Sequence, residues 1–284
     1  MYAMNRQVLL IVVVFALTLM SFGNYDKKGA EETKSVVHFA EQNVEEVTDE
    51  PQELVVKSIE VLIYGEHSQT ITLRYDDKNR LVEVVNEDAE AGSIIYTGNE
   101  VKLVEDFSTT TYKYSGGKPT EGCIDMGEYG KINIKYTFDG DKISRIRRDF
   151  VSEGGGDLVT YVWNKDCIIK ETRVYDDMEI PLETTFEYTK IRNPFTIDVL
   201  SIINSSPGVS SFGKGFVSEF LPSKSVYNGL TDGYIETVTT TTYEYVVDQA
   251  TGKISAINID VKEEMNDGGI IDVSTNSITV KLKY

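Results

Sequence analysis

The sequence is poor in the residues on which metal sites and acid–base catalysis most often depend. Among 284 residues there are two cysteines and two histidines, too few for a cysteine-rich zinc module. Lysine and arginine number 28 against 46 aspartates and glutamates, so the formal net charge is -18. Phosphate backbones repel a chain of this charge, and we therefore expect no nucleic-acid partner.

Long apolar runs are also missing, with one exception near the start. Val8 to Met20 carries no charge, Arg6 precedes it, and Ser21-Phe22-Gly23 offers the small residues of a signal-peptidase site. At about 1.5 Å per residue the run spans ~20 Å, less than the ~30 Å that a membrane anchor has to cross. We therefore predict a secretory signal peptide at residues 1–23, export to the periplasm or cell surface, and no transmembrane helix in the mature chain.

The residues after this run differ from those of a lipoprotein. Gly23, Asn24 and Tyr25 stand where a lipobox cysteine would lie, so we expect no lipid anchor. Residues 24–53 then carry nine acidic side chains and three lysines. Apolar residues between 36 and 47 recur at helical spacing, and Pro51 would end such a helix. We interpret residues 24–53 as a solvated, partly helical linker; a tether that holds the next domain off a surface is the alternative.

From residue 54 to the last residue the sequence is typical of antiparallel β-structure. Runs rich in Val, Ile, Thr, Tyr and Phe are separated by clusters of Gly, Asn and Asp, as in successive hairpins. Ile132–Phe138 and Ile278–Tyr284 alternate apolar and polar residues, which indicates one buried and one wet face. We predict a single β domain at residues 54–284.

A degenerate repeat runs through this domain: an aromatic residue, any residue, a second aromatic residue, and then a polar turn. The second aromatics at 114, 138, 163 and 188 are 24, 25 and 25 residues apart, which is enough for two strands and two short turns. We therefore predict a large meander of hairpins that forms a curved or barrel-like sheet, with the aromatics in the core or in cross-strand pairs; a ligand platform is the alternative. The aromatic residues that recur two apart along a strand are Tyr112 and Tyr114, Tyr136 and Phe138, Tyr161 and Trp163, Phe186 and Tyr188, and Tyr243 and Tyr245.

One segment interrupts the strand pattern. Asn193-Pro194 has the order of a helix N-cap followed by proline at the first helical position. Phe195, Val199 and Ile202 would then share one face, and Ser205–Gly208 would end the helix. We predict one short helix near residues 194–205, followed by a long connection to about residue 233 that covers a sheet edge or has a functional role.

Several short motifs occur here in an order found in other proteins. They are Tyr161-Val-Trp163-Asn164, Phe186-Glu-Tyr188, Phe212-Gly-Lys-Gly215, Leu221-Pro-Ser-Lys224, Tyr243-Glu-Tyr245 and Gly252-Lys-Ile254. This order resembles a family of exported proteins of unknown function from gut Bacteroidota with a porin-like fold. The turn Tyr75-Asp-Asp-Lys-Asn-Arg-Leu81 is similar to the unit of YD-type repeat proteins. The resemblance implies a rolled antiparallel β fold and an envelope location, and it brings no catalytic residue.

No catalytic motif is complete. Gly208–Gly215 approximates a phosphate-binding loop, but Gly215 replaces the magnesium-ligating Ser or Thr. His38 lies in the acidic segment and His67 in an expected turn, so neither suits a Ser-His-Asp triad. The aspartate pairs at expected hairpin tips lack EF-hand spacing, and aspartate starts turns without a metal. We expect no enzyme activity, no cofactor and no metal site.

The two cysteines allow two interpretations. Export into an oxidising space permits a disulfide between Cys123 and Cys167. Two free thiols are the alternative, because spacing in the sequence cannot place the two Cα atoms within reach.

Charges within the expected strands bear on whether the sheet spans a membrane. Arg145 and Arg147 lie on one face of their strand and Arg148 on the other, and a charge on a lipid-facing side costs about 2–4 kcal/mol at the midplane. We therefore prefer a water-exposed sheet to an outer-membrane barrel. The function we expect is a binding module for a glycan, lipid or peptide, with a structural or partner-binding envelope protein as the alternative. The candidate lining residues are Tyr161, Trp163, Phe212 and Phe216.

Overall fold

The computed structural model describes residues 55–87, 91–105, 107–178, 180–195, 198–203, 217–231 and 235–284. These residues belong to one compact unit that runs from Glu53 to Tyr284. The expected signal peptide at 1–23 and the acidic segment at 24–53 lie outside the described residues, as do Phe212 and Phe216.

Sixteen strands, one α-helix and one 3₁₀ turn lie within the described residues. The strands in the first half are β1 (Ser58–Ile63), β2 (Glu66–Tyr75), β3 (Leu81–Val85), β4 (Ala91–Thr97), β5 (Glu100–Val104), β6 (Thr109–Ser115), β7 (Lys118–Asp125) and β8 (Lys131–Asp139). Those in the second half are β9 (Lys142–Phe150), β10 (Gly156–Asn164), β11 (Cys167–Tyr175), β12 (Leu182–Arg192), β13 (Phe220–Thr231), β14 (Ile235–Val247), β15 (Ile254–Asp267) and β16 (Ile270–Lys283). The helix is α2 (Val199–Ile203), and the 3₁₀ turn is η1 (Gly127–Tyr129).

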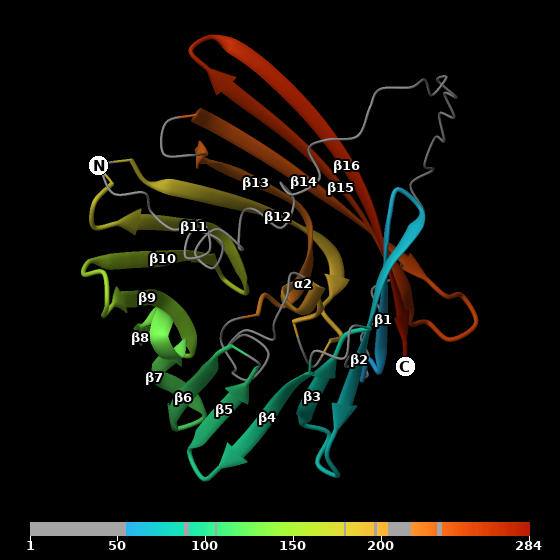
Figure 1. Cartoon of the computed structure of the whole chain (residues 1–284). Helices are drawn as coiled ribbons and strands as arrows, with labels where there is room; N and C mark the ends of the chain where they lie inside the picture. Colours follow the sequence, from blue (N-terminus) through green and yellow to red (C-terminus); the bar gives the residue numbers. More distant parts are fainter. Residues whose placement is uncertain are drawn as a thin grey trace. The chain divides into compact units, whose positions relative to one another are not determined.

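The strands form one closed antiparallel barrel in the order of the sequence. Each strand pairs with the next, and β1 closes the ring by pairing with β16 from Ser58↔Lys283 to Ile63↔Ile278 (Figure 1). This confirms the predicted meander of hairpins and shows that the sheet closes. Closure leaves a barrel with no edge strand where the ring is complete.

The wall has a mostly apolar inner face and a polar outer face. In β8, Ile132, Ile134 and Tyr136 are buried, whereas Asn133 and Lys135 between them are exposed. A barrel wall has only two faces, and α2 lies inside the ring of strands, where its side chains join the same core (Figure 1). The buried residues, every second one along a strand, therefore point inward, and the alternation in the sequence marks which residues fill the barrel.

The helical segment is shorter than predicted and begins later. The side-chain oxygen of Asn193 accepts a hydrogen bond of 3.1 Å from the backbone N–H of Phe195, which is an Asx turn and not a helix cap. Phe195 forms a β-bridge, and the described helix covers only Val199–Ile203. Val199 and Ile202 are almost fully buried, so this short helix packs its apolar face into the barrel core.

Candidate functional site

The barrel wall opens between β11 and β12. Their ladder covers only Lys170–Arg173 and Leu182–Thr185. Beyond Lys170, Cys167 still pairs with β10 through Asn164, while β12 continues along β13 as far as Arg192↔Phe220. The two strands therefore separate toward the turn that joins β10 to β11.

Ser218 and Glu219, which directly precede β13, bridge this gap and fix its width. Ser218 accepts a hydrogen bond of 3.0 Å from the backbone N–H of Ile168, and the N–H of Glu219 donates to the carbonyl of Asp166 at 2.9 Å. On the other side, the N–H of Asn193 donates to the carbonyl of Glu219 at 2.7 Å. Tyr188 crosses the gap as well, because its hydroxyl donates to the carbonyl of Ile168 at 2.6 Å. The gap is thus framed by hydrogen bonds and is preformed.

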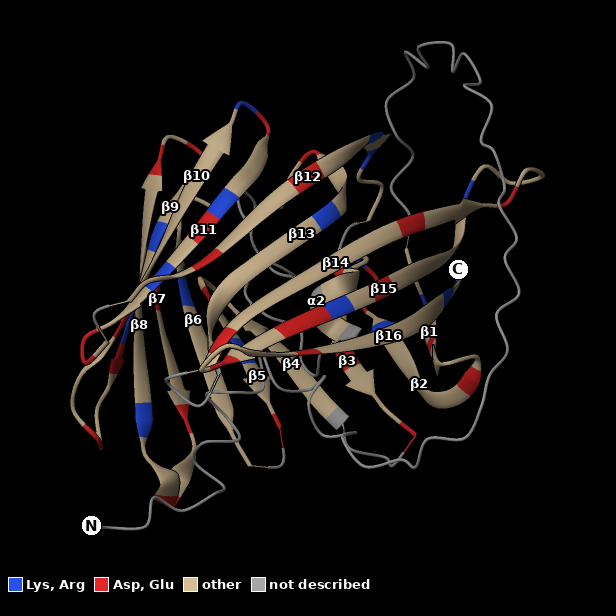
Figure 2. Cartoon of the chain, turned by 90° about the horizontal axis from the view of Figure 1, so that it is seen from above, with Lys and Arg blue, Asp and Glu red and all other residues tan. Residues whose placement is uncertain are grey.

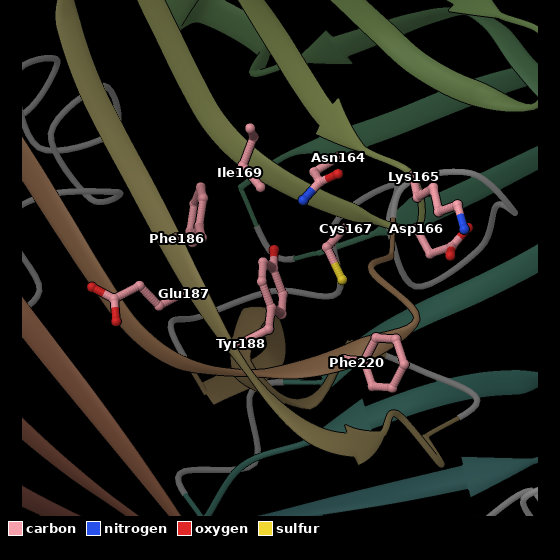
Figure 3. Close-up of a pocket in the computed structure, with 9 residues that line it drawn as sticks. All are labelled: Asn164, Lys165, Asp166, Cys167, Ile169, Phe186, Glu187, Tyr188 and Phe220. Carbon is pink, nitrogen blue, oxygen red and sulfur yellow. The ribbon is translucent and has the colours of Figure 1, made fainter.

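A cavity of about 420 Å³ occupies this gap. Its lining combines three aromatic rings and an isoleucine with the polar turn between β10 and β11 (Figure 3). The lining residues are Asn164, Lys165, Asp166, Cys167, Ile169, Phe186, Glu187, Tyr188 and Phe220. A mostly apolar concavity with a few polar groups at its edge is the usual form of a small-molecule site.

The polar groups of the cavity lie at its rim. Lys165 holds a left-handed backbone with φ +49°, although glycine is the residue that adopts this conformation without strain. Asp166 lies 3.6 Å from the ammonium of Lys142, so its charge is partly matched. Burial raises the pKa of Tyr188 to about 12, so its hydroxyl is protonated at neutral pH and acts as a hydrogen-bond donor. The arrangement suits a neutral or amphipathic ligand.

A second polar group of residues lies on the inner face of β9, β10 and β11. Asp157 is fully buried and receives two hydrogen bonds from the guanidinium of Arg148, one of them 2.8 Å long. Arg173 lies 3.8 Å from Asp157 and 3.5 Å from Glu171. Two cations thus face two carboxylates inside the wall, which neutralises the group without an external ion.

Of the four predicted lining residues, the structure describes Tyr161 and Trp163, and neither lines the cavity. Tyr161 faces inward beside Glu171, its direct cross-strand partner, and burial raises its pKa well above the usual range. Trp163 donates a hydrogen bond of 2.7 Å to the carbonyl of Ile143, with the ammonium of Lys142 over its ring at 5.3 Å. Both residues therefore have structural contacts in the wall.

The structure contains the two free thiols, Cys123 and Cys167, and no disulfide between them. Cys123 lies in β7 and Cys167 in β11, and three strands stand between them in the ring. Neighbouring strands are about 4.8 Å apart, so the two Cα atoms are well beyond the ~7 Å that a disulfide allows.

The sequence interpretation missed most of the cavity. Phe186 and Tyr188 were recognised as members of the aromatic repeat but not as residues that line a cavity. Cys167 was considered only as a partner in a disulfide. Phe220 was not singled out. The one signal that could have pointed here is the long connection after β12, because a break in the hairpin pattern marks where neighbouring strands are free to separate.

The described ranges contain neither a candidate metal site nor a candidate membrane helix. No three His, Cys, Asp or Glu side chains gather there as a metal site. No helix there has the length and apolar character that crossing a membrane requires.

Comparison with solved structures identifies the fold. A porin-like protein from Bacteroides uniformis superposes with a TM-score of 0.56 at 14% identity, covering 82% of this chain and 100% of that one. A porin-like protein from Bacteroides vulgatus gives a TM-score of 0.55 at 15% identity, covering 81% and 98%. The chain has a porin-like barrel fold. At this identity the likeness extends to the fold alone, and it confirms the resemblance inferred from the aromatic and turn motifs. No protein-family model and no curated protein matches the chain.

Proposed function

We propose that the chain is an exported, non-enzymatic envelope protein that binds a small amphipathic ligand in the cavity between β11 and β12. The observation that carries the proposal is the preformed gap in an otherwise closed wall, with a cavity of about 420 Å³ lined by Phe186, Tyr188 and Phe220. Cavities of roughly 300–1,000 Å³ with this kind of lining are typical ligand sites.

The polarity of the wall supports a barrel that is surrounded by water. Figure 2 shows basic and acidic residues along the middle of many strands, and outward side chains such as Lys135 in β8, Arg145 in β9 and Lys262 in β15 are exposed. A membrane barrel needs an apolar outer band ~25 Å tall, and each Lys or Arg in it costs about 2–4 kcal/mol at the midplane. The alternation here is the reverse, with the apolar side chains inside.

The cavity favours one chemical class among glycans, lipids and peptides. Its body is apolar, and three of its polar residues, Asn164, Lys165 and Asp166, lie together on the turn at one side, whereas Glu187 lies on the opposite side and pairs with Lys224 at 3.4 Å (Figure 3). The faces of a sugar ring stack on aromatic side chains, but the hydroxyls around the ring need hydrogen-bond partners, and few polar groups line this cavity. We therefore propose a ligand with a short acyl chain or an aromatic group as its body and a polar head at the turn.

Thermal unfolding of residues 24–284 against short-chain fatty acids, bile acids, aromatic amino acids, oligosaccharides and peptides tests the proposal. A ligand at a hundred times its Kd stabilises the fold by about 2.7 kcal/mol, which raises the Tm by roughly 5–10 °C. Phe186→Ala and Phe220→Ala should each abolish the shift, whereas Phe107→Ala, at a ring that is 81% exposed, should leave it unchanged. Shifts that survive both cavity substitutions would place the ligand elsewhere and contradict the proposal.

A further inference from the structure

One strand of the barrel extends beyond its neighbour. β16 pairs with β15 over most of its length, from Ile270↔Asp267 to Lys281↔Ala256. Its pairing with β1 ends earlier, at Ile278↔Ile63. Among the described residues, the stretch Ile270–Asn276 therefore has a ladder on one side and no strand on the other, and Figure 1 shows the β15–β16 hairpin projecting from the ring.

The contacts of Tyr64 show which backbone groups face this free edge. The N–H of Tyr64 donates to the carbonyl of Ser277 at 3.0 Å, and its hydroxyl donates to the carbonyl of Thr275 at 2.8 Å. In an antiparallel ladder, alternate residues direct both backbone groups to the same side. The N–H and C=O of Val273 and Ile271 consequently point to the free edge as well.

Side chains along the free edge are exposed on both faces. Ile270 is 75% exposed, Ile271 67% and Val273 49%. Ile271, Val273 and Thr275 share the outer face, since their partners on β15 are Asn266, Glu264 and Lys262. A strand edge that combines unpaired backbone groups with β-branched side chains is a template for pairing with another strand.

We propose that this edge pairs with the same edge of a second copy of the chain, antiparallel about a two-fold axis at Val273. The free stretch of seven residues is centred on Val273, so this register pairs every one of them. Val273 then faces Val273 of the second copy, Ile271 faces Thr275, and Asp272 faces Ser274. No like charges lie opposite each other, and the outer face gains a row of β-branched cross-strand pairs.

Neighbouring registers are less favourable. An axis at Asp272 places two aspartates directly opposite each other, which is destabilising. An axis at Ser274 brings Ile270 of the second copy opposite Ile278, which is already paired with Ile63 of β1. In the Val273 register the carbonyl of Thr275 accepts a second hydrogen bond beside that from Tyr64, as its two lone pairs permit.

The expected dimer is weak and salt-dependent. A contact of two edge strands is smaller than the ~1,600 Å² of a standard interface, so we expect a dissociation constant in the micromolar range. Each chain has a formal charge of -18, and salt screens the repulsion between two copies. Dimerisation should therefore strengthen as the salt concentration rises.

A charge-exchange experiment at the two-fold axis tests the register. Sedimentation velocity of the full mature chain, from low micromolar to near-millimolar concentration, should show a monomer–dimer equilibrium. Val273→Glu and Val273→Lys each place like charges opposite each other and should weaken the dimer at least tenfold, which corresponds to about 1.4 kcal/mol. An equimolar mixture of the two variants should restore dimer formation, because a glutamate then faces a lysine.

The matched control is Val174→Glu, at a valine of β11 that is 40% exposed, and it should leave the equilibrium unchanged. Circular dichroism and thermal unfolding of each variant confirm that it is folded. A wild-type chain that stays monomeric at all concentrations would overturn the proposal, as would a dimer that tolerates either single charge or a mixture that fails to restore it. The first of these results would indicate that the edge is free or covered by another segment.

Discussion

Trp163 at the end of β10 donates a hydrogen bond of 2.7 Å to the backbone carbonyl of Ile143 at the start of β9. The same contact recurs around the barrel, with the hydroxyls of Tyr96 and Tyr284 bound to the carbonyls of Leu81 and Ile254. Each aromatic residue closes the open end of its own hairpin. Of the four aromatics that set the repeat of about 25 residues, Trp163 and Tyr188 make this contact, whereas the hydroxyl of Tyr114 has no hydrogen-bond partner among the described residues and Phe138 has no donor group.

Trp163→Phe should destabilise the fold without affecting ligand binding. The substitution removes the hydrogen bond to Ile143 and weakens the contact with Lys142, and together these are worth about 1–2 kcal/mol. Urea unfolding measures the loss as a lower midpoint at an unchanged slope. Tyr129→Phe, at an exposed tyrosine, is the control and should change the midpoint little. An unchanged midpoint for Trp163→Phe would refute a structural role.

Asp157→Asn should be among the most damaging single substitutions in the barrel. Asp157 is fully buried and holds the guanidinium of Arg148, so the amide would leave a cation in the wall without its counter-charge. Breaking a buried pair from one side costs about 3–5 kcal/mol. Thermal and urea unfolding should both show the loss, whereas Asp149→Asn, at an exposed partner of Arg147, should cost far less. Similar losses for the two variants would contradict this account.

His67 should titrate above its ordinary pKa of 6.5. A hydrogen bond from its ring to Glu87, at 2.9 Å, raises the pKa of His67 and lowers that of Glu87. Because the folded-state pKa of His67 is raised, its contribution to stability is complete below pH 6.5 and is lost as the pH rises through the folded-state value. The lowered pKa of Glu87 has the opposite sign, so its contribution is lost as the pH falls through that lowered value.

Proton NMR of the His67 ring measures this titration directly. Glu87→Gln should move the midpoint of His67 down toward 6.5, while Glu66→Gln, at an exposed neighbour in the same strand, should leave it in place. If the titration midpoint of His67 is the same in Glu87→Gln as in the wild-type chain, the His67–Glu87 pair does not persist in solution.

Both cysteines should be alkylated without prior reduction. Cys123 and Cys167 are free, and Cys123 is the more exposed of the two. Mass spectrometry after treatment of the unfolded chain should find two modified thiols, and in the folded chain Cys123 should react first. A ligand that fills the cavity should slow the reaction of Cys167 and leave that of Cys123 unchanged. A chain that accepts no label when unfolded would contain the bridge that the structure lacks.

Local patterns were sufficient to predict the strands and the order in which they lie. The alternation in Ile132–Phe138 identified the inward face of β8 correctly, because a side-chain period of two leaves only one face to bury. The placement of Arg145 and Arg147 against Arg148 on opposite faces was confirmed as well. The aromatic spacing predicted one hairpin per repeat, since each unit closes on itself within about 25 residues.

The site was not predictable in the same way. Trp163 was expected to line a ligand site, but its partner is a backbone carbonyl, and backbone atoms leave no mark on a sequence. The predicted start of the helix was also wrong, since the side chain of Asn193 accepts a hydrogen bond from Phe195 in an Asx turn and the helix begins at Val199. The cavity depends on where the β11–β12 ladder stops. Glu219, which bridges the two strands beyond that point, lies at the end of the connection between β12 and β13.

The sequence by itself determined the class of this fold, its hairpin unit and the polarity of its wall, because these depend on contacts between residues close together in the chain. Closure of β1 on β16, the separation of Cys123 from Cys167 and the gap that forms the cavity were decided by the tertiary structure. Each of these depends on how sixteen strands share one circumference, and small shifts of register between distant strands have no local signal in the sequence.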